Sequence, residues 1–286
     1  MTTQTGEQMM THLSPIIGYH RAPLSQKFGA PRQPNLVGVI SAIEMSAPFD
    51  TPAAFVGLEA FSHLWLSWSF HHNQHFYAEQ SHQASDQAKP SFRAQVRPPR
   101  LGGNQKIGVF ASRSMYRPSQ LGLSVVKLES IEIVDGRVIL MISGADLIDG
   151  TPIIDIKPYV AYSDSIDKAN SGFAPIAPVA LEVTITDNAH AQFLSLVTRT
   201  DSANNSTTKN NQTLNAKVLM DKIQQQVRAE DMGLIQALIA QDPRPAYRRD
   251  ELNATFTMRY KSVDVSFCQV EQGQLQIIAV VAVILN

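Results

Sequence analysis

The residues best suited to hold a charged ligand are arginines and lysines gathered in one segment of the chain. Between Lys89 and Lys127 there are eight basic residues and no acidic residue, although the whole protein has a net charge of only −1. Several of these arginines stand beside Pro-Pro, Gly-Gly or Arg-Pro, where proline and glycine fix the backbone. A guanidinium can pair with two oxygens of a phosphate or carboxylate at once. The segment therefore predicts a rigid anion-binding loop, with a solvated basic surface as the alternative.

Further turns place polar groups where a ligand can reach them. In Pro31–Pro34 (PRQP), two prolines fix the backbone while Arg32 and Gln33 present hydrogen-bond donors, although an ordinary corner between strands fits equally well. Residues 146–152 (DLIDGTP) offer two carboxylates and a hydroxyl, and an Asx-type turn is the alternative. A histidine pair, His71 and His72, stands at a predicted strand end. No acid or fourth ligand is suitably spaced beside it, so we predict a pocket rim and no metal site.

The elements that must position these groups are short strands. The predicted strands of the first part are Ile16–His20, Leu36–Met45, Phe61–His72, Ile107–Ala111, Leu121–Val134, Arg137–Ser143 and Ile153–Tyr159. Asp135-Gly136 predicts a hairpin between two of them, and Thr51–Ala60 predicts a short helix. Many short strands separated by Gly/Pro turns are typical of a closed or nearly closed antiparallel β-barrel. The strand ends of such a barrel form a mouth, where ligand sites tend to lie.

The pattern changes after about residue 187, and we predict a smaller α+β domain there. Helical spacing covers Ala189–Arg199 and Lys217–Ala240, and Gly233 is expected to divide the second stretch into two helices. The polar segment 200–212 predicts a mobile loop. A small sheet is predicted from Phe256–Tyr260, Val263–Phe267 and Leu275–Leu285. We place the boundary near residues 172–178, which gives a mainly β protein with a barrel domain at 12–174 and an α+β domain at 175–286.

Several classes of protein are disfavoured by what the sequence lacks. The longest apolar run, Ile277–Leu285, is shorter than the roughly 20 residues of a membrane helix. The N-terminal residues show no signal peptide, and the single cysteine, Cys268, excludes an internal disulfide. Neither the glycine fingerprint of a Rossmann domain nor a phosphate-binding P-loop occurs. We therefore expect a soluble, cytoplasmic protein without a membrane segment.

Motifs along the chain carry a resemblance to a known family. They are PRQP (31–34), GLEAFSHLWL (57–66), VRPPRLGGN (96–104), GVFASRSMYRP (108–118), LGLSVVKLE (121–129), DLIDGTPIIDIKPY (146–159) and DPRPAYR (242–248). In this order they closely resemble the TrmO family (TsaA-like) of tRNA methyltransferases. The resemblance is dense over residues 14–172. In the C-terminal third it rests mainly on DPRPAYR and the strands that follow.

The resemblance implies a β-barrel enzyme that uses S-adenosylmethionine as methyl donor without a Rossmann domain and works as a homodimer. Its implied reaction methylates the exocyclic N6 of threonylcarbamoyl-adenosine next to the anticodon of certain tRNAs. Carried over motif by motif, the residues that contact the methyl donor are Arg32, Gln33, Pro34, His71, His72, Arg113, Leu123, Thr151, Pro152, Ile153 and Ile154.

Methyl transfer mainly requires that nitrogen and methyl be held close and aligned, with a group that accepts the nitrogen's proton. The candidates for that base are Asp146 and Asp149. For tRNA we expect contacts to phosphates or to the threonyl carboxylate and stacking on exposed bases. The candidate residues are Arg97, Arg100, Tyr116, Arg117, Lys157 and Tyr159. The rival interpretations are a non-catalytic RNA- or nucleoside-binding regulatory module and an enzyme that methylates another adenine derivative or a small molecule.

One departure from the family pattern lies in the basic segment. After Arg117-Pro118 the family usually has Asn-Pro, where this chain has Ser119-Gln120. The serine keeps a hydroxyl but loses the amide, and Gln120 has a backbone N–H that proline lacks. If the family's asparagine holds substrate, the rate of reaction or the choice of tRNA is expected to differ in this protein.

Overall fold

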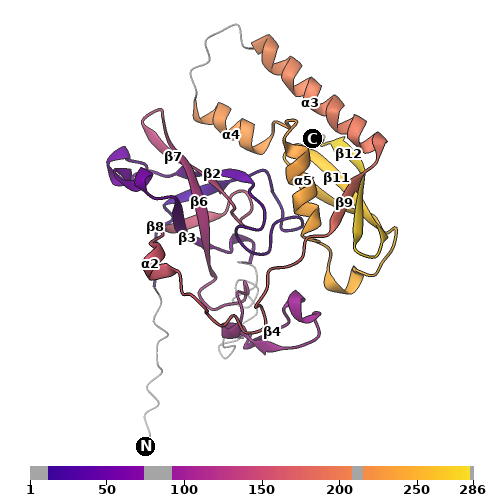
Figure 1. Ribbon diagram of the computed structural model, residues 1–286. Coiled ribbons are helices and arrows are strands. Elements are labelled where there is room, and N and C mark those ends of the chain that lie inside the picture. The colour runs from indigo at the N-terminus through magenta and orange to yellow at the C-terminus, as the bar shows by residue number, and fades with distance from the viewer. Residues whose placement is uncertain (1–11, 74–91, 208–214, 284–286) are drawn as a thin grey trace, which may run out of the picture.

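The first part of the chain forms a closed barrel of six antiparallel strands (Figure 1). The computed structural model describes residues 12–73, 92–207 and 215–283. Around the barrel the strands are β1 (Gly18–Arg21), β2 (Ile40–Met45), β7 (Arg137–Ser143), β6 (Leu121–Val134), β3 (His63–Ser69) and β8 (Pro152–Pro158). The predicted barrel and the β6–β7 hairpin at Asp135-Gly136 are confirmed. Within the described residues, no helix is long and apolar enough to cross a membrane.

Alternate side chains of β3 fill the interior of the barrel, as the alternation of apolar and polar residues in this strand predicts. Leu64, Leu66 and Trp68 point inward and are buried, while the residues between them are half-buried on the outer face. Trp68 faces Gly122 of β6, and a Cβ at Gly122 would lie 2.2 Å from the indole ring. A glycine is therefore required for this large ring to fit inside the barrel.

The long basic segment between β3 and β6, called the basic excursion below, has less regular structure than predicted. It contains η3 (His71–Asn73), β4 (Gln95–Val96), η4 (Pro99–Leu101), β5 (Ile107–Gly108) and η5 (Val109–Ala111). The strand predicted at 107–111 is thus only two residues long, because the chain turns into a 3₁₀ helix after Gly108. The helix predicted at 51–60 is two 3₁₀ turns, η1 (Pro52–Phe55) and η2 (Leu58–Ala60). The left-handed Gly57 (φ 90°) separates them.

The second part of the chain is a four-stranded sheet covered by helices, as Figure 1 shows. Its strands, in spatial order, are β10 (Phe256–Tyr260), β11 (Val263–Glu271), β12 (Gln274–Ala282) and β9 (Glu182–Ile185), the last parallel to β12. The helices of this part are α3 (Asp187–Thr207), α4 (Ala216–Gln224) and α5 (Asp231–Ala240), with a 3₁₀ turn η6 (Ala246–Arg248). A short helix, α2 (Ala161–Asp164), follows β8.

Two details of the helices differ from the predictions. Gly233 lies inside α5, and the break falls instead between Gln224 and Asp231. It falls there because the buried Asp231 carboxylate accepts the backbone N–H of Arg228 and fixes the start of α5. The loop predicted at 200–212 is also shorter than expected, because α3 continues to Thr207. Once a helix has formed, each further residue adds a backbone hydrogen bond, so a polar segment can extend it. The remainder of that segment lies outside the described residues.

The two parts pack against each other through the long loop between β1 and β2. Leu24, Val37 and Val39 of this loop join the apolar core of the C-terminal sheet and its helices. On the other side, Met220 and Ile223 of α4 pack against residues of the barrel wall. The loop that carries the PRQP turn is therefore held between the barrel and the C-terminal part.

Candidate functional site

The PRQP turn and the basic segment meet at one end of the barrel. The side-chain oxygen of Gln33 accepts a hydrogen bond of 2.6 Å from Arg113, although 80 residues separate the two in sequence. Asn35 holds the turn in place: its amide donates to the carbonyl of Val125 (3.0 Å), and its backbone N–H donates to that of Gly144 (2.8 Å). The structure thus brings together two motifs predicted separately to contact the methyl donor.

Asp146 lies beside this pair at the end of a buried hydrogen-bond chain. The indole N–H of Trp68 donates to the hydroxyl of Ser124 (3.0 Å), and that hydroxyl donates to the Asp146 carboxylate (2.6 Å). Burial raises the pKa of Asp146 above its ordinary value, against smaller opposing effects from the Ser124 hydrogen bond and the Arg113 charge. A desolvated carboxylate with one firm donor is suited to accept a proton.

Asp149, the other predicted base, is held differently. One carboxylate oxygen accepts two hydrogen bonds, from the backbone N–H of Ala22 (3.0 Å) and the side-chain amide of Gln224 (2.8 Å). The backbone N–H of Asp149 donates to the carbonyl of Leu24 (2.7 Å). Asp149 therefore fastens the turn at 149–152 to its neighbours, and these contacts favour a positioning role over proton transfer.

The two histidines lie together directly after β3. The rings of His71 and His72, both in η3, have centroids 4.1 Å apart. Burial lowers the pKa of His71, and the neighbouring ring of His72 adds to the effect. Asp149 and Lys27 also influence this pKa, so their charges lie within electrostatic range of the ring. At neutral pH His71 is therefore a neutral ring that can donate or accept a hydrogen bond. No group of three or more metal-ligating side chains is found in the described parts of the chain.

The turn at Thr151–Ile154 presents its backbone more than its side chains. Thr151 and Ile153 are buried, and the Thr151 hydroxyl donates to the carbonyl of Ile148 (2.8 Å). Ile154 lies at a β-bulge, where β8 shifts register against β3. Leu123 lies on the outer face of β6 opposite Ser67, with 56% of its surface exposed. A ligand can thus contact the backbone of the turn or the Leu123 side chain, but not the core-facing Ile153 side chain.

Arg32 makes a contact that the sequence pattern did not reveal. Its guanidinium donates to the backbone carbonyls of Asp242 (3.3 Å) and Arg244 (3.1 Å), in the DPRPAYR motif of the C-terminal part. Burial lowers the pKa of Arg32, and the nearby Arg249 lowers it further. Arg32 therefore ties the PRQP turn to the C-terminal part while standing next to Gln33.

The basic excursion presents cations and aromatic rings side by side. The guanidinium of Arg93 lies 4.0 Å from the ring centre of Tyr116, and that of Arg117 lies 5.4 Å from the ring centre of Phe110. Arg117 also donates to the carbonyl of Ser112 (3.2 Å), and Arg100 donates to that of Ile176. Such stacked cations and rings suit the bases and phosphates of single-stranded RNA.

The remaining predicted tRNA-binding residues lie elsewhere on the barrel. Lys157 forms a loose ion pair with Asp155 (3.8 Å), and the Tyr159 ring lies 6.0 Å from that of Trp65. Lys157 pairs with Trp65 near the start of β3, whereas the basic excursion begins after the other end of this strand. The structure therefore divides the predicted tRNA-binding residues into two groups.

The sequence did not predict the residues whose hydrogen bonds hold the site in place. Asn35, Ser124 and Trp68 were not predicted: Ser124 bonds to the predicted Asp146, Trp68 bonds to Ser124, and Asn35 fixes the end of the PRQP turn. The available signals were local: Asn35 directly follows PRQP, and Ser124 is a polar residue at an inward-facing position of an alternating strand. Gln224 gave no local signal, because its partner is 75 residues away.

Comparisons with known proteins show the family to which the chain belongs. The family model described as the tRNA-methyltransferase O N-terminal domain matches residues 19–165, and the TrmO C-terminal domain model matches residues 211–283. An Escherichia coli (strain K12) protein named tRNA (adenine(37)-N6)-methyltransferase is 35% identical over 262 residues, covering 88% of this chain and 93% of that protein. A Pseudomonas aeruginosa protein named "Putative S-adenosylmethionine-dependent methyltransferase RcsF" is 38% identical over 257 residues, covering 90% and 92%. The crystal structure of TrmO from Pseudomonas aeruginosa matches with a TM-score of 0.67 and 30% identity, covering 96% of this chain and all of that one.

Proposed function

The chain belongs to the TrmO family, and we propose that it transfers a methyl group from S-adenosylmethionine to the exocyclic N6 of an adenine in tRNA. The acceptor we propose is threonylcarbamoyl-adenosine next to the anticodon. The observation that carries the proposal is the hydrogen bond between Gln33 and Arg113, beside the half-buried Asp146. It joins motifs from distant parts of the sequence into one polar site at the end of the barrel.

The residues at this site fit the methyl donor by their chemistry. S-adenosylmethionine supplies an activated methyl group on a positively charged sulfur, and it also carries a carboxylate and an adenine. Arg113 is exposed and can pair with the carboxylate. Gln33 and the neutral His71 offer hydrogen bonds for polar groups of the donor, and the Asp146 charge complements the positive sulfur. We propose that the turn at 151–154 contributes backbone groups and that Leu123 contributes an apolar surface.

We propose Asp146 as the group that takes the proton from N6. The nitrogen of threonylcarbamoyl-adenosine lies between a purine and a carbonyl, so it loses its proton more readily than the amine of adenine. As the new N6–carbon bond forms and the carbon–sulfur bond breaks, the nitrogen loses its proton to the Asp146 carboxylate. The raised pKa of Asp146 makes it a stronger base than an ordinary aspartate. Ser124 keeps the carboxylate oriented during the transfer.

The basic excursion is the surface that we propose for tRNA. Arg97 and Arg100 are exposed, and they together with Arg117 would meet phosphates or the threonyl carboxylate. Tyr116 already stacks with Arg93, which prepares a flat surface for an unpaired base. We propose Lys157 and Tyr159 as a second contact region, for a more distant part of the tRNA.

We further propose that the enzyme is a cytoplasmic homodimer with a barrel domain at 12–174 and a C-terminal domain at 175–286. Leu121 and Leu123 support the dimer, because they expose 42% and 56% of their surface on one face of β6. A neighbouring copy that covers this face would lie next to Leu123 of the proposed donor site. Sedimentation at micromolar concentration should report twice the mass of the chain. A monomer that methylates tRNA at full rate would contradict the dimer.

The reaction is tested by incubating the full chain with labelled S-adenosylmethionine and two preparations of the same tRNA, with and without the threonylcarbamoyl group. We expect transfer only to the modified tRNA, with the label recovered on N6 after digestion to nucleosides. Equal transfer to both preparations would contradict the proposed acceptor. Binding of donor and tRNA without any transfer would contradict the enzyme and favour a regulatory module.

A further inference from the structure

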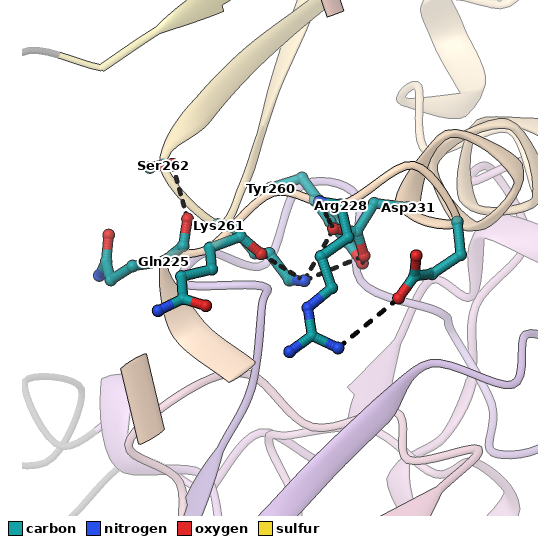
Figure 2. A network of polar contacts seen from close by, with 8 residues as sticks. Gln225, Arg228, Asp231, Tyr260, Lys261 and Ser262 are labelled. Carbon is teal, nitrogen blue, oxygen red and sulfur yellow. Dashed lines mark hydrogen bonds and ion pairs between the residues drawn. The ribbon is translucent and has the colours of Figure 1, made fainter. Parts of the chain in front are cut away.

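A buried polar network fixes the C-terminal end of α4 (Figure 2). The ammonium of Lys261 donates to both carboxylate oxygens of Asp231 (2.8 and 3.0 Å) and to the carbonyl of Gln226 (2.9 Å). The hydroxyl of Tyr260 donates to the same carboxylate (2.7 Å), and that of Ser262 donates to the carbonyl of Gln225 (2.7 Å). The Lys261 and Asp231 side chains expose only 8% and 4% of their surface. The residues that follow α4 are therefore held rigidly by the β10–β11 turn.

The β10–β11 turn and α4 also make hydrogen bonds to the barrel part of the chain. The backbone N–H of Lys261 donates to the carbonyl of Pro23 in the β1–β2 loop (2.6 Å). One residue before the fixed segment, the amide of Gln224 donates to the carboxylate of Asp149 (2.8 Å). This oxygen also accepts the backbone N–H of Ala22, so one of its donors comes from the barrel part and one from the C-terminal part.

Asp149 begins the 149–152 turn, which leads into the segment 151–154 that we propose to contact the methyl donor. Gly150 follows in the left-handed region (φ 75°), and the backbone N–H of Gly150 donates to the carbonyl of His20 (2.8 Å). The turn is therefore held by backbone hydrogen bonds and, in addition, by the two hydrogen bonds to the Asp149 side chain. Arg32 attaches the other proposed donor turn to the C-terminal part in a similar way, through the carbonyls of Asp242 and Arg244.

We infer that Gln224 is a positioning residue for the 149–152 turn, so that the C-terminal part sets the affinity of the barrel for the methyl donor. This inference rests on the proposed donor site. Loss of the Gln224 donor leaves the half-buried Asp149 carboxylate with one hydrogen bond where it had two. The turn then samples other positions, and donor binding has to reorder it.

The test compares three variants of the full chain with the wild type. Gln224→Met keeps the volume of the side chain and removes the donor, Gln224→Lys restores a donor, and Gln225→Met is the matched control. Gln225 is exposed beside Gln224, and its side chain makes no hydrogen bond in the described structure. We expect Gln224→Met to raise the donor Kd and the donor KM about three- to ten-fold, the effect of one hydrogen bond, with a smaller change in kcat. Gln224→Lys should return the donor Kd to within about two-fold of the wild type, and Gln225→Met should not change it.

Hydrogen exchange of the unliganded protein gives a readout that does not depend on the donor. In Gln224→Met the amides of Gly150 and Thr151 should exchange faster than in the wild type. A lower melting temperature with unchanged donor Kd and unchanged exchange at the turn would overturn the inference and leave Gln224 a structural contact only. If the turn exchanges faster but the wild type binds no S-adenosylmethionine, the proposed donor site is wrong and the mechanical link between Gln224 and the turn stands.

Discussion

The sharpest single perturbation of the barrel is Gly122→Ala. A Cβ at this position would lie 2.2, 2.3 and 2.6 Å from three atoms of the Trp68 indole, where ordinary contacts begin near 3.4 Å. The ring has to move by about 1 Å inside a packed barrel, which costs roughly 1–3 kcal/mol. Movement of the ring also breaks the hydrogen bond from Trp68 to Ser124, at about 1 kcal/mol. We therefore expect Gly122→Ala to lower the free energy of unfolding by about 2–4 kcal/mol.

Denaturant unfolding followed by far-ultraviolet circular dichroism measures this loss directly. The matched control is Gly38→Ala, because a Cβ at Gly38 meets nothing within 4 Å. It should change the free energy of unfolding by less than about 0.5 kcal/mol. In a Trp68→Leu background the clash is gone, so adding Gly122→Ala should cost less than about 1 kcal/mol. A full loss in that background would refute the reasoning, as would a Gly122→Ala variant no less stable than the control.

Three further predictions concern the site. Gln120 has a left-handed backbone (φ 52°), and its backbone N–H donates to the carbonyl of Arg117. Proline can supply neither, so Gln120→Pro should lower the free energy of unfolding by more than about 1 kcal/mol, whereas Gln120→Gly should be tolerated. Equal melting temperatures of the two variants would contradict this prediction. The base must be ionised, so activity at saturating donor should fall as the pH drops through the raised pKa of Asp146. Ser124→Ala removes a hydrogen bond that lowers the pKa of Asp146, so the fall of activity at low pH should begin at a higher pH in this variant. An unchanged pH profile would exclude Asp146 as the base. Arg113→Ala should weaken binding of the methyl donor even without tRNA. Arg97→Ala should leave the donor Kd unchanged and should reduce, by about one unit, the slope of log K for tRNA binding against log salt concentration. If both variants changed donor binding and tRNA binding in the same way, the two arginines would be assigned wrongly.

Local patterns in the sequence were enough to predict most of the barrel. The alternation in β3 and the Asp135-Gly136 turn between β6 and β7 depend on neighbours in the chain, and both are present as predicted. The α4–α5 break was predicted at the wrong place. Glycine is a weak local signal for a break, whereas the buried Asp231 and its partner Lys261 actually fix the start of α5.

The sequence by itself determined the motifs, and from these motifs we predicted Gln33, Arg113, Asp146 and Asp149 as site residues. Only the tertiary structure decided how they are used. The hydrogen bond from Arg113 to Gln33 joins residues far apart in sequence, and no local pattern predicts such a pair. The two aspartates stand three residues apart in one motif, yet Asp146 is desolvated beside Ser124 while Asp149 is held by Gln224 of the C-terminal part. Burial and hydrogen-bond partners set the basicity and mobility of a carboxylate, and both are properties of the folded chain as a whole.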